Sequence, residues 1–218
     1  MKVEYSNGAI VNGQIRRFEQ WRQRLSGHAA LLVNLVLEEI VPQFISRGFD
    51  RFPNYAGDNS MVIGANCIPL QRRSGVEWPT VEISFHRRER PLSNLMFACL
   101  PEVCQRRIDG PPKQILRIEA NVVEGPAAFL LCKGTRKNYG CSFGYNWFAL
   151  RPRSKINDEV HTLRSRTAWL LDRFDSGIPL DWLQSGPGHV HEYVVCLRMP
   201  CWDGERWIPN RERWNPHV

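Results

Sequence analysis

A series of short apolar segments, which read as β-strands rather than helices, constrains the fold of this chain most. Val81, Ile83 and Phe85 alternate with polar residues, so one face of this strand should be buried and the other solvated. Because the spacers between segments are short, they predict an antiparallel meander rather than parallel strands joined by crossover helices. The predicted strands are 60–68, 80–86, 94–100, 115–124, 127–133 and 142–150.

Longer stretches with apolar residues at helical spacing flank these strands. The predicted helices are 14–25, 28–47 and 155–174. The second is rich in leucine and valine and is predicted to be the core helix, with Pro42 kinking it or beginning a new turn. In the third, Asp158 and Glu159 are predicted to lie in the first turn, where the helix dipole favours acids.

These elements predict a single α+β domain in which an antiparallel sheet is packed on one face by helices. Residues 1–27 form an N-terminal arm with a short amphipathic helix, and residues 28–185 form the core domain. Residues 186–218 add a strand, HVHEYVVCLRM, and a tryptophan-rich tail that packs on the core.

The net charge of +7 indicates an affinity for anionic partners such as nucleic acid or acidic proteins. Most of the cations are arginines, whose planar guanidinium suits carboxylate and phosphate. An ordinary solvated surface, with arginine favoured by a GC-rich genome, explains the same composition.

The 7 cysteines are odd in number and form no CxxC pair, and several, as in FLLC and VVC, lie in apolar runs. This usage is typical of small buried thiols in a reducing cytoplasm. The N-terminal segment has no apolar signal core, and no run approaches the roughly 20 apolar residues that span a bilayer. A cytoplasmic protein that does not enter membranes is predicted.

Glu82 and His86 share the predicted solvated face of one strand, and Glu119 lies on that of another. If these strands pair, the carboxylates could bind a divalent cation or act as acid and base. The lysine of a D…ExK nuclease motif is missing after Glu119. Cross-strand ion pairs on an ordinary solvated sheet account for the same residues.

Other signals of chemistry are weak. His189 and His191 lie two apart on a predicted strand and would ligate a metal only with a third ligand from elsewhere. Cys141 follows Arg136 and Lys137, whose charges could lower a thiol pKa, but a glycine-rich hairpin explains the same stretch. We predict no cofactor.

Arginine pairs near the predicted strand ends, together with tail tryptophans, form the candidate partner-binding surface. Such pairs collect at the rim of a sheet, and exposed Trp and Arg are typical of interface hot spots. Solvated strand ends and a buried tail are the alternative. The candidate residues are Arg72, Arg73, Arg87, Arg88, Arg90, Arg106, Arg107, Trp202, Trp207 and Trp214.

The segments VPQFISRGFDRF (41–52), IPLQRR (68–73), VEISFHRRERP (81–91) and FDSGIPLDWL (174–183) resemble a group of uncharacterised bacterial α+β domains of unknown function. The resemblance covers about residues 28–185. It implies a bacterial cytoplasmic protein from a toxin–immunity or phage-defence locus, and it implies no catalytic residue.

The leading hypothesis is a non-enzymatic protein that recognises a macromolecular partner, most plausibly another protein. A basic nucleic-acid-binding subunit is the first alternative. A hydrolase or nuclease that uses Glu82, His86 and Glu119 is the second.

Overall fold

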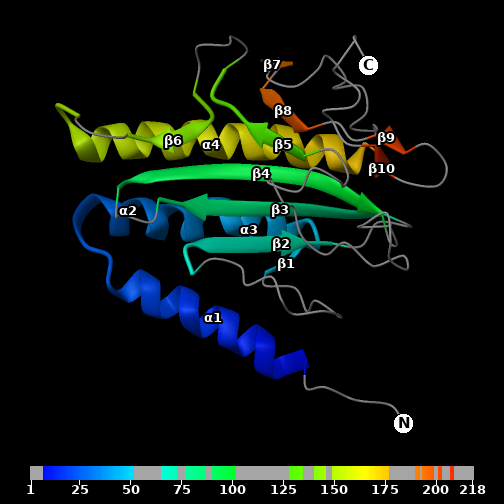
Figure 1. Cartoon of the computed structure of the whole chain (residues 1–218). Helices are drawn as coiled ribbons and strands as arrows, with labels where there is room; N and C mark the ends of the chain where they lie inside the picture. The colour runs from blue at the N-terminus through cyan, green and yellow to red at the C-terminus, as the bar shows by residue number, and fades with distance from the viewer. Residues whose placement is uncertain are drawn as a thin grey trace.

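A computed structural model gives the fold of the chain (Figure 1). The structure describes residues 7–51, 65–72, 77–86, 90–101, 128–134, 140–145, 149–176, 190–191, 193–198, 201–202 and 207–208. The predicted strand 115–124, with Glu119, lies outside these residues.

The helices correspond to the predicted stretches, except that the first helix begins at Asn7, well before the predicted start at residue 14. They are α1 (Asn7–Gln23), α2 (Gly27–Leu35), the π-helical turn η1 (Val36–Ile40), α3 (Val41–Ser46) and α4 (Pro152–Asp175). Gly48, at φ +80°, follows α3, where left-handed backbone favours glycine. Because α4 begins at Pro152, Glu159 lies beyond its first turn. The prediction that Asp158 and Glu159 lie in the first turn is therefore wrong, and Glu159 is only 5% exposed.

The strands confirm the α+β class and the antiparallel sheet. One sheet contains β1 (Asp50–Arg51), β2 (Cys67–Gln71), β3 (Glu77–Phe85), β4 (Leu92–Pro101), β5 (Ala128–Leu131), β6 (Ser142–Gly144), β7 (Val190–His191) and β8 (Val194–Arg198). Its order is β1-β2-β3-β4-β5-β8-β7, with β6 also paired to β4, and every described pair is antiparallel. A separate hairpin joins β9 (Cys201–Trp202) to β10 (Trp207–Ile208).

Two strands, β5 and β6, lie end to end along the same edge of β4 (Figure 1). Leu130 pairs with Met96, so the next residue, Leu131, falls opposite Leu95. Ser142 pairs with Asn94, the adjacent position on β4. Residues 132–141 are therefore an excursion from what is otherwise one strand.

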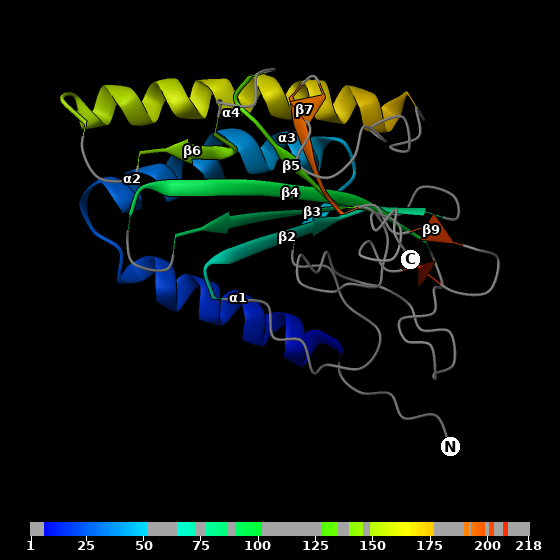
Figure 2. The ribbon, with the colours of Figure 1, turned by 45° about the horizontal axis from the view of Figure 1, so that its top comes forward.

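The core lies between the sheet and the helices. Phe97 of β4 contacts Phe174 of α4 at a ring-centroid distance of 6.0 Å, and Phe49 lies 5.9 Å from the same Phe174 ring. The helix α1 packs beside the strands through Trp21, whose ring stacks on Phe85 at 5.7 Å. In the views of Figures 1 and 2, α1 lies next to β2 and α4 lies next to β4, at the two ends of the row of strands β2–β4.

The second face of the sheet differs from the prediction. Glu82 and Thr80 are 1% and 0% exposed, and Gln71, 2% exposed, donates a 2.9 Å hydrogen bond to the Thr80 hydroxyl. This face is therefore buried at Thr80 and Glu82 and half-buried at Ser84 and His86, so the prediction that it is solvated is wrong. A regular alternation identifies one buried face but does not report whether the opposite face is also covered.

The helical run from Gly27 to Ser46 is 20 residues long and contains an 18-residue stretch with a mean hydropathy of 1.5, so by length and composition alone it could cross a membrane. The expectation that no run reaches this length is therefore wrong. Core helices of soluble proteins pass the same test, and here Val36, Ile40 and Phe44 are 0% exposed within the core.

Candidate functional site

A π-helical turn interrupts the core helix directly before Pro42. The Val41 amide donates to the Val36 carbonyl, five residues back, instead of four. Proline has no amide hydrogen and its ring crowds the carbonyl four residues earlier, so the helix has a physical reason to widen here. The Gln43 side-chain amide donates to the Glu39 carbonyl at 2.9 Å and satisfies a backbone acceptor in the widened turn.

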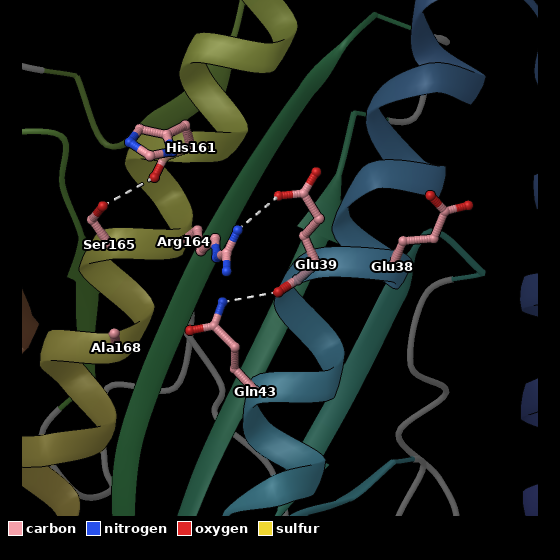
Figure 3. A pocket seen from close by; sticks show the side chains of 7 residues that line it. All are labelled: Glu38, Glu39, Gln43, His161, Arg164, Ser165 and Ala168. Carbon is pink, nitrogen blue, oxygen red and sulfur yellow. Dashed lines mark hydrogen bonds and ion pairs between the residues drawn. The ribbon is translucent and has the colours of Figure 1, made fainter.

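The widened turn forms one wall of a groove of about 560 Å³, and α4 forms the other (Figure 3). The groove is lined by Glu38, Glu39, Gln43, His161, Arg164, Ser165 and Ala168. Figure 3 shows Glu39 and Arg164 pointing toward each other across the groove, whereas Glu38 points away from α4. Short π-helical turns in α-helices frequently occur at functional sites, which makes this groove the candidate site.

The charges in the groove are only loosely paired. Arg164 Nη1 lies 3.8 Å from Glu39 Oε2, and the two side chains are 60% and 38% exposed. Ion pairs this exposed are worth roughly 0–1 kcal/mol, so a partner could replace either member at small cost. Among the described residues, no group of three or more His, Cys, Asp or Glu could hold a metal ion.

Arg72, a predicted partner-binding residue, lies elsewhere and is held within the molecule. Its guanidinium forms a 2.7 Å salt bridge with Asp175, donates to the Arg47 carbonyl at 2.9 Å and lies 5.0 Å from the centre of the Phe49 ring. Only 14% of the side chain is exposed. Arg47 also bonds Asp172 and Asp175, and the hydrogen bond to Asp175 is the main reason that the pKa of Arg47 is raised. These residues tie β2, α3 and α4 together.

The structure places few of the other predicted partner-binding residues. Arg90 is half-buried immediately before β4. Trp202 and Trp207 are register partners in the hairpin β9–β10. The rest lie outside the described residues: Arg73, Arg87, Arg88, Arg106, Arg107 and Trp214.

Of the predicted catalytic residues, the structure describes Glu82 and His86. Glu82 is buried on β3, with its Oε2 3.9 Å from Cys67 Sγ. His86 is half-buried after the end of β3, where its amide donates to the Leu92 carbonyl at 3.0 Å. Glu119 lies outside the described residues.

Of the predicted metal-binding pair His189 and His191, the structure describes His191. His191 lies in β7 opposite Val194 of β8, so the chain reverses at this point, and His189 lies outside the described residues. The single strand predicted here is therefore a hairpin.

Sequence reasoning missed two features. The groove residues carry no motif, and Pro42 was the one signal of an irregular turn beside them. Cys132 and Cys141 form a disulfide, which the expectation of free buried thiols did not include, whereas Cys67 is buried beside Glu82. Comparisons of the chain with family models, curated proteins and solved structures found no match. The resemblance to uncharacterised bacterial domains remains a prediction.

Proposed function

We propose that this chain is a non-enzymatic recognition protein that binds a partner protein through the groove between the helix of residues 27–46 and α4. The observation that carries the proposal is the π-helical turn, which places Glu39 opposite Arg164 at an accessible groove. A bacterial cytoplasmic protein of the immunity or defence-accessory type fits this role.

The groove chemistry supports a protein partner more than a small molecule. Small-molecule sites usually bury most of the ligand surface, whereas His161, Arg164 and Ser165 are all exposed. Opposite charges on the two walls can exchange their weak mutual pair for pairs with a partner's side chains. Ile45, on the next turn of α3, is 46% exposed and offers an apolar contact close to the groove in sequence.

A nucleic-acid-binding subunit is the alternative, and the net charge of +7 favours it. The carboxylates of Glu38 and Glu39 make the groove itself unfavourable for phosphate. On this alternative, the contact surface would lie elsewhere on the molecule, and binding would weaken steeply and log-linearly with salt.

Affinity capture from the native host, with and without nuclease, distinguishes these two functions. The captured chains are the wild type and two matched charge-reversal variants. Arg164→Glu changes the groove, and Arg17→Glu makes the same charge change at an exposed position on α1. We expect a stoichiometric protein that survives nuclease, and at least about tenfold less of it with Arg164→Glu but not with Arg17→Glu. Material lost on nuclease treatment, or equal effects of both reversals, would overturn the proposal.

A further inference from the structure

We infer that Cys132 and Cys141 form a reversible dithiol–disulfide site, which exchanges with small thiols and disulfides through Cys141. The two cysteines are the first and last residues of the excursion between β5 and β6. Because Leu131 and Ser142 fall on adjacent positions along β4, the excursion returns to its starting point, and the Cα atoms of Cys132 and Cys141 lie 4.0 Å apart.

The two ends of the excursion, at Cys132 and Cys141, form its neck. Contacts other than the sulfur–sulfur bond hold the first side of this neck, at Cys132 and Lys133. The Cys132 amide donates to the Tyr193 carbonyl at 2.6 Å. The next residue, Lys133, accepts two hydrogen bonds of 3.1 Å at its carbonyl from the guanidinium of Arg166. The Lys133 ammonium lies 2.6 Å from a carboxylate oxygen of Glu159 on α4.

The second side is held by the sheet. Ser142, directly after Cys141, pairs with Asn94, and Gly144 pairs with Leu92. The Gly144 amide also donates to Glu159 at 3.4 Å, so the same carboxylate binds both sides of the neck. Reduction removes none of these contacts, so the two thiols should stay adjacent and poised to re-form the bond.

The two sulfurs differ in access. Cys132 is 0% exposed, whereas Cys141 is half-buried. An incoming thiolate should therefore attack the sulfur of Cys141, because exchange requires access to the sulfur that is attacked. The sulfur–sulfur bond breaks, Cys132 leaves as a thiolate and takes a proton, and Cys141 carries the mixed disulfide.

A second small thiolate then attacks the mixed disulfide and releases Cys141. The balance is two small thiols oxidised to one small disulfide and one protein disulfide reduced to two thiols. Oxidation of the protein is the reverse reaction, with a low-molecular-weight disulfide as the oxidant.

Glutathione and its disulfide can test this inference on the full chain, with adducts located by peptide mass mapping so that the remaining cysteines are distinguished. Reduced glutathione or dithiothreitol should open the wild-type bond without denaturant, and glutathione disulfide should close it again. In Cys132→Ser, glutathione disulfide should modify Cys141 at least about tenfold faster than it modifies Cys132 in Cys141→Ser. Circular dichroism should show that both variants are folded.

A wild-type chain that forms no Cys132–Cys141 bond with glutathione disulfide would overturn the inference, as would a bond that opens only in urea. Equal modification of the two cysteines would overturn the assigned order of attack. If either variant fails to fold, the mixed disulfide trapped on the wild-type chain during limited reduction gives the same information, and it must lie on Cys141. A protein that binds no partner would leave these results unchanged, so the test is independent of the proposed function.

Discussion

Arg72 and Asp175 form a salt bridge of 2.7 Å that joins the end of β2 to the last residue of α4. The same guanidinium lies over Phe49, so its charge and its planar surface are both used inside the molecule. An arginine that the sequence presents as a free cation near a strand end is therefore a structural link in the folded protein.

Arg72→Ala should lower the free energy of unfolding by about 1–2 kcal/mol, because it removes the salt bridge, a hydrogen bond and the packing on Phe49. Urea denaturation measures this loss. Arg164→Ala is the control, since its ion pair with Glu39 is mostly exposed and its loss should change stability by less than about 0.5 kcal/mol. Equal losses in the two variants would contradict the structural assignment of Arg72.

The pH dependence of stability should include a contribution from Asp175. Burial works to raise the pKa of this carboxyl, but hydrogen bonds and charge from Arg72 and Arg47 outweigh it and lower the pKa. The stabilisation should thus be fully present above the unfolded-state pKa, about 4, and be lost as the pH falls through the folded-state value.

Asp175→Asn removes this titration, so its stability should fall less than that of the wild type between about pH 6 and pH 3. Urea midpoints across this range provide the measurement, and Asp158→Asn, an exposed position on α4, provides the control. The assignment fails if Asp175→Asn and the wild type lose stability in parallel.

Glu159→Gln should destabilise the protein by about 1–3 kcal/mol, because it leaves the ammonium groups of Lys133 and Lys155 without their shared carboxylate. Lys155 is half-exposed and can regain water, which keeps the expected loss below that for a fully buried pair. Thermal or urea unfolding checks the value. The neighbouring exposed Asp158→Asn should be neutral, and a neutral Glu159→Gln would show that the carboxylate does not hold the neck.

Gly144→Ala should cost about 2 kcal/mol or more, because a Cβ at this residue would lie 1.9 Å from the Pro91 carbonyl oxygen and the backbone has φ +110°. Gly140→Ala is a control in the excursion just before β6, where an added Cβ meets nothing closer than 4.0 Å. Unfolding midpoints compare the two. Similar stabilities would show that the chain relaxes around residue 144.

Elements that bury one regular stripe of side chains were predictable from the sequence. The strand 80–86 and the helix 155–174 correspond to β3 and α4. In both, the spacing of the apolar residues equals the spacing at which side chains share one face of a strand or of a helix. The start of α1 at Asn7 was missed, since two Asn-Gly pairs favour turns locally.

The site was much less predictable, because it depends on which distant side chains meet. Glu159 and Lys133 are 26 positions apart, and no local pattern links them. Glu82 lies on a polar stripe that is buried, and burial of a second face depends on the rest of the fold. The groove likewise needs two helices that are far apart in the chain.

The end-to-end arrangement of β5 and β6 also makes the excursion, residues 132–141, a suitable site for inserting or exchanging a segment. Since its two ends return to neighbouring positions on one strand, the intervening residues can be shortened, lengthened or replaced by a fluorescent or affinity module with little change in the path of the sheet. A sensor built there would report from a fixed point directly beside α4, with both chain ends of the protein left unmodified.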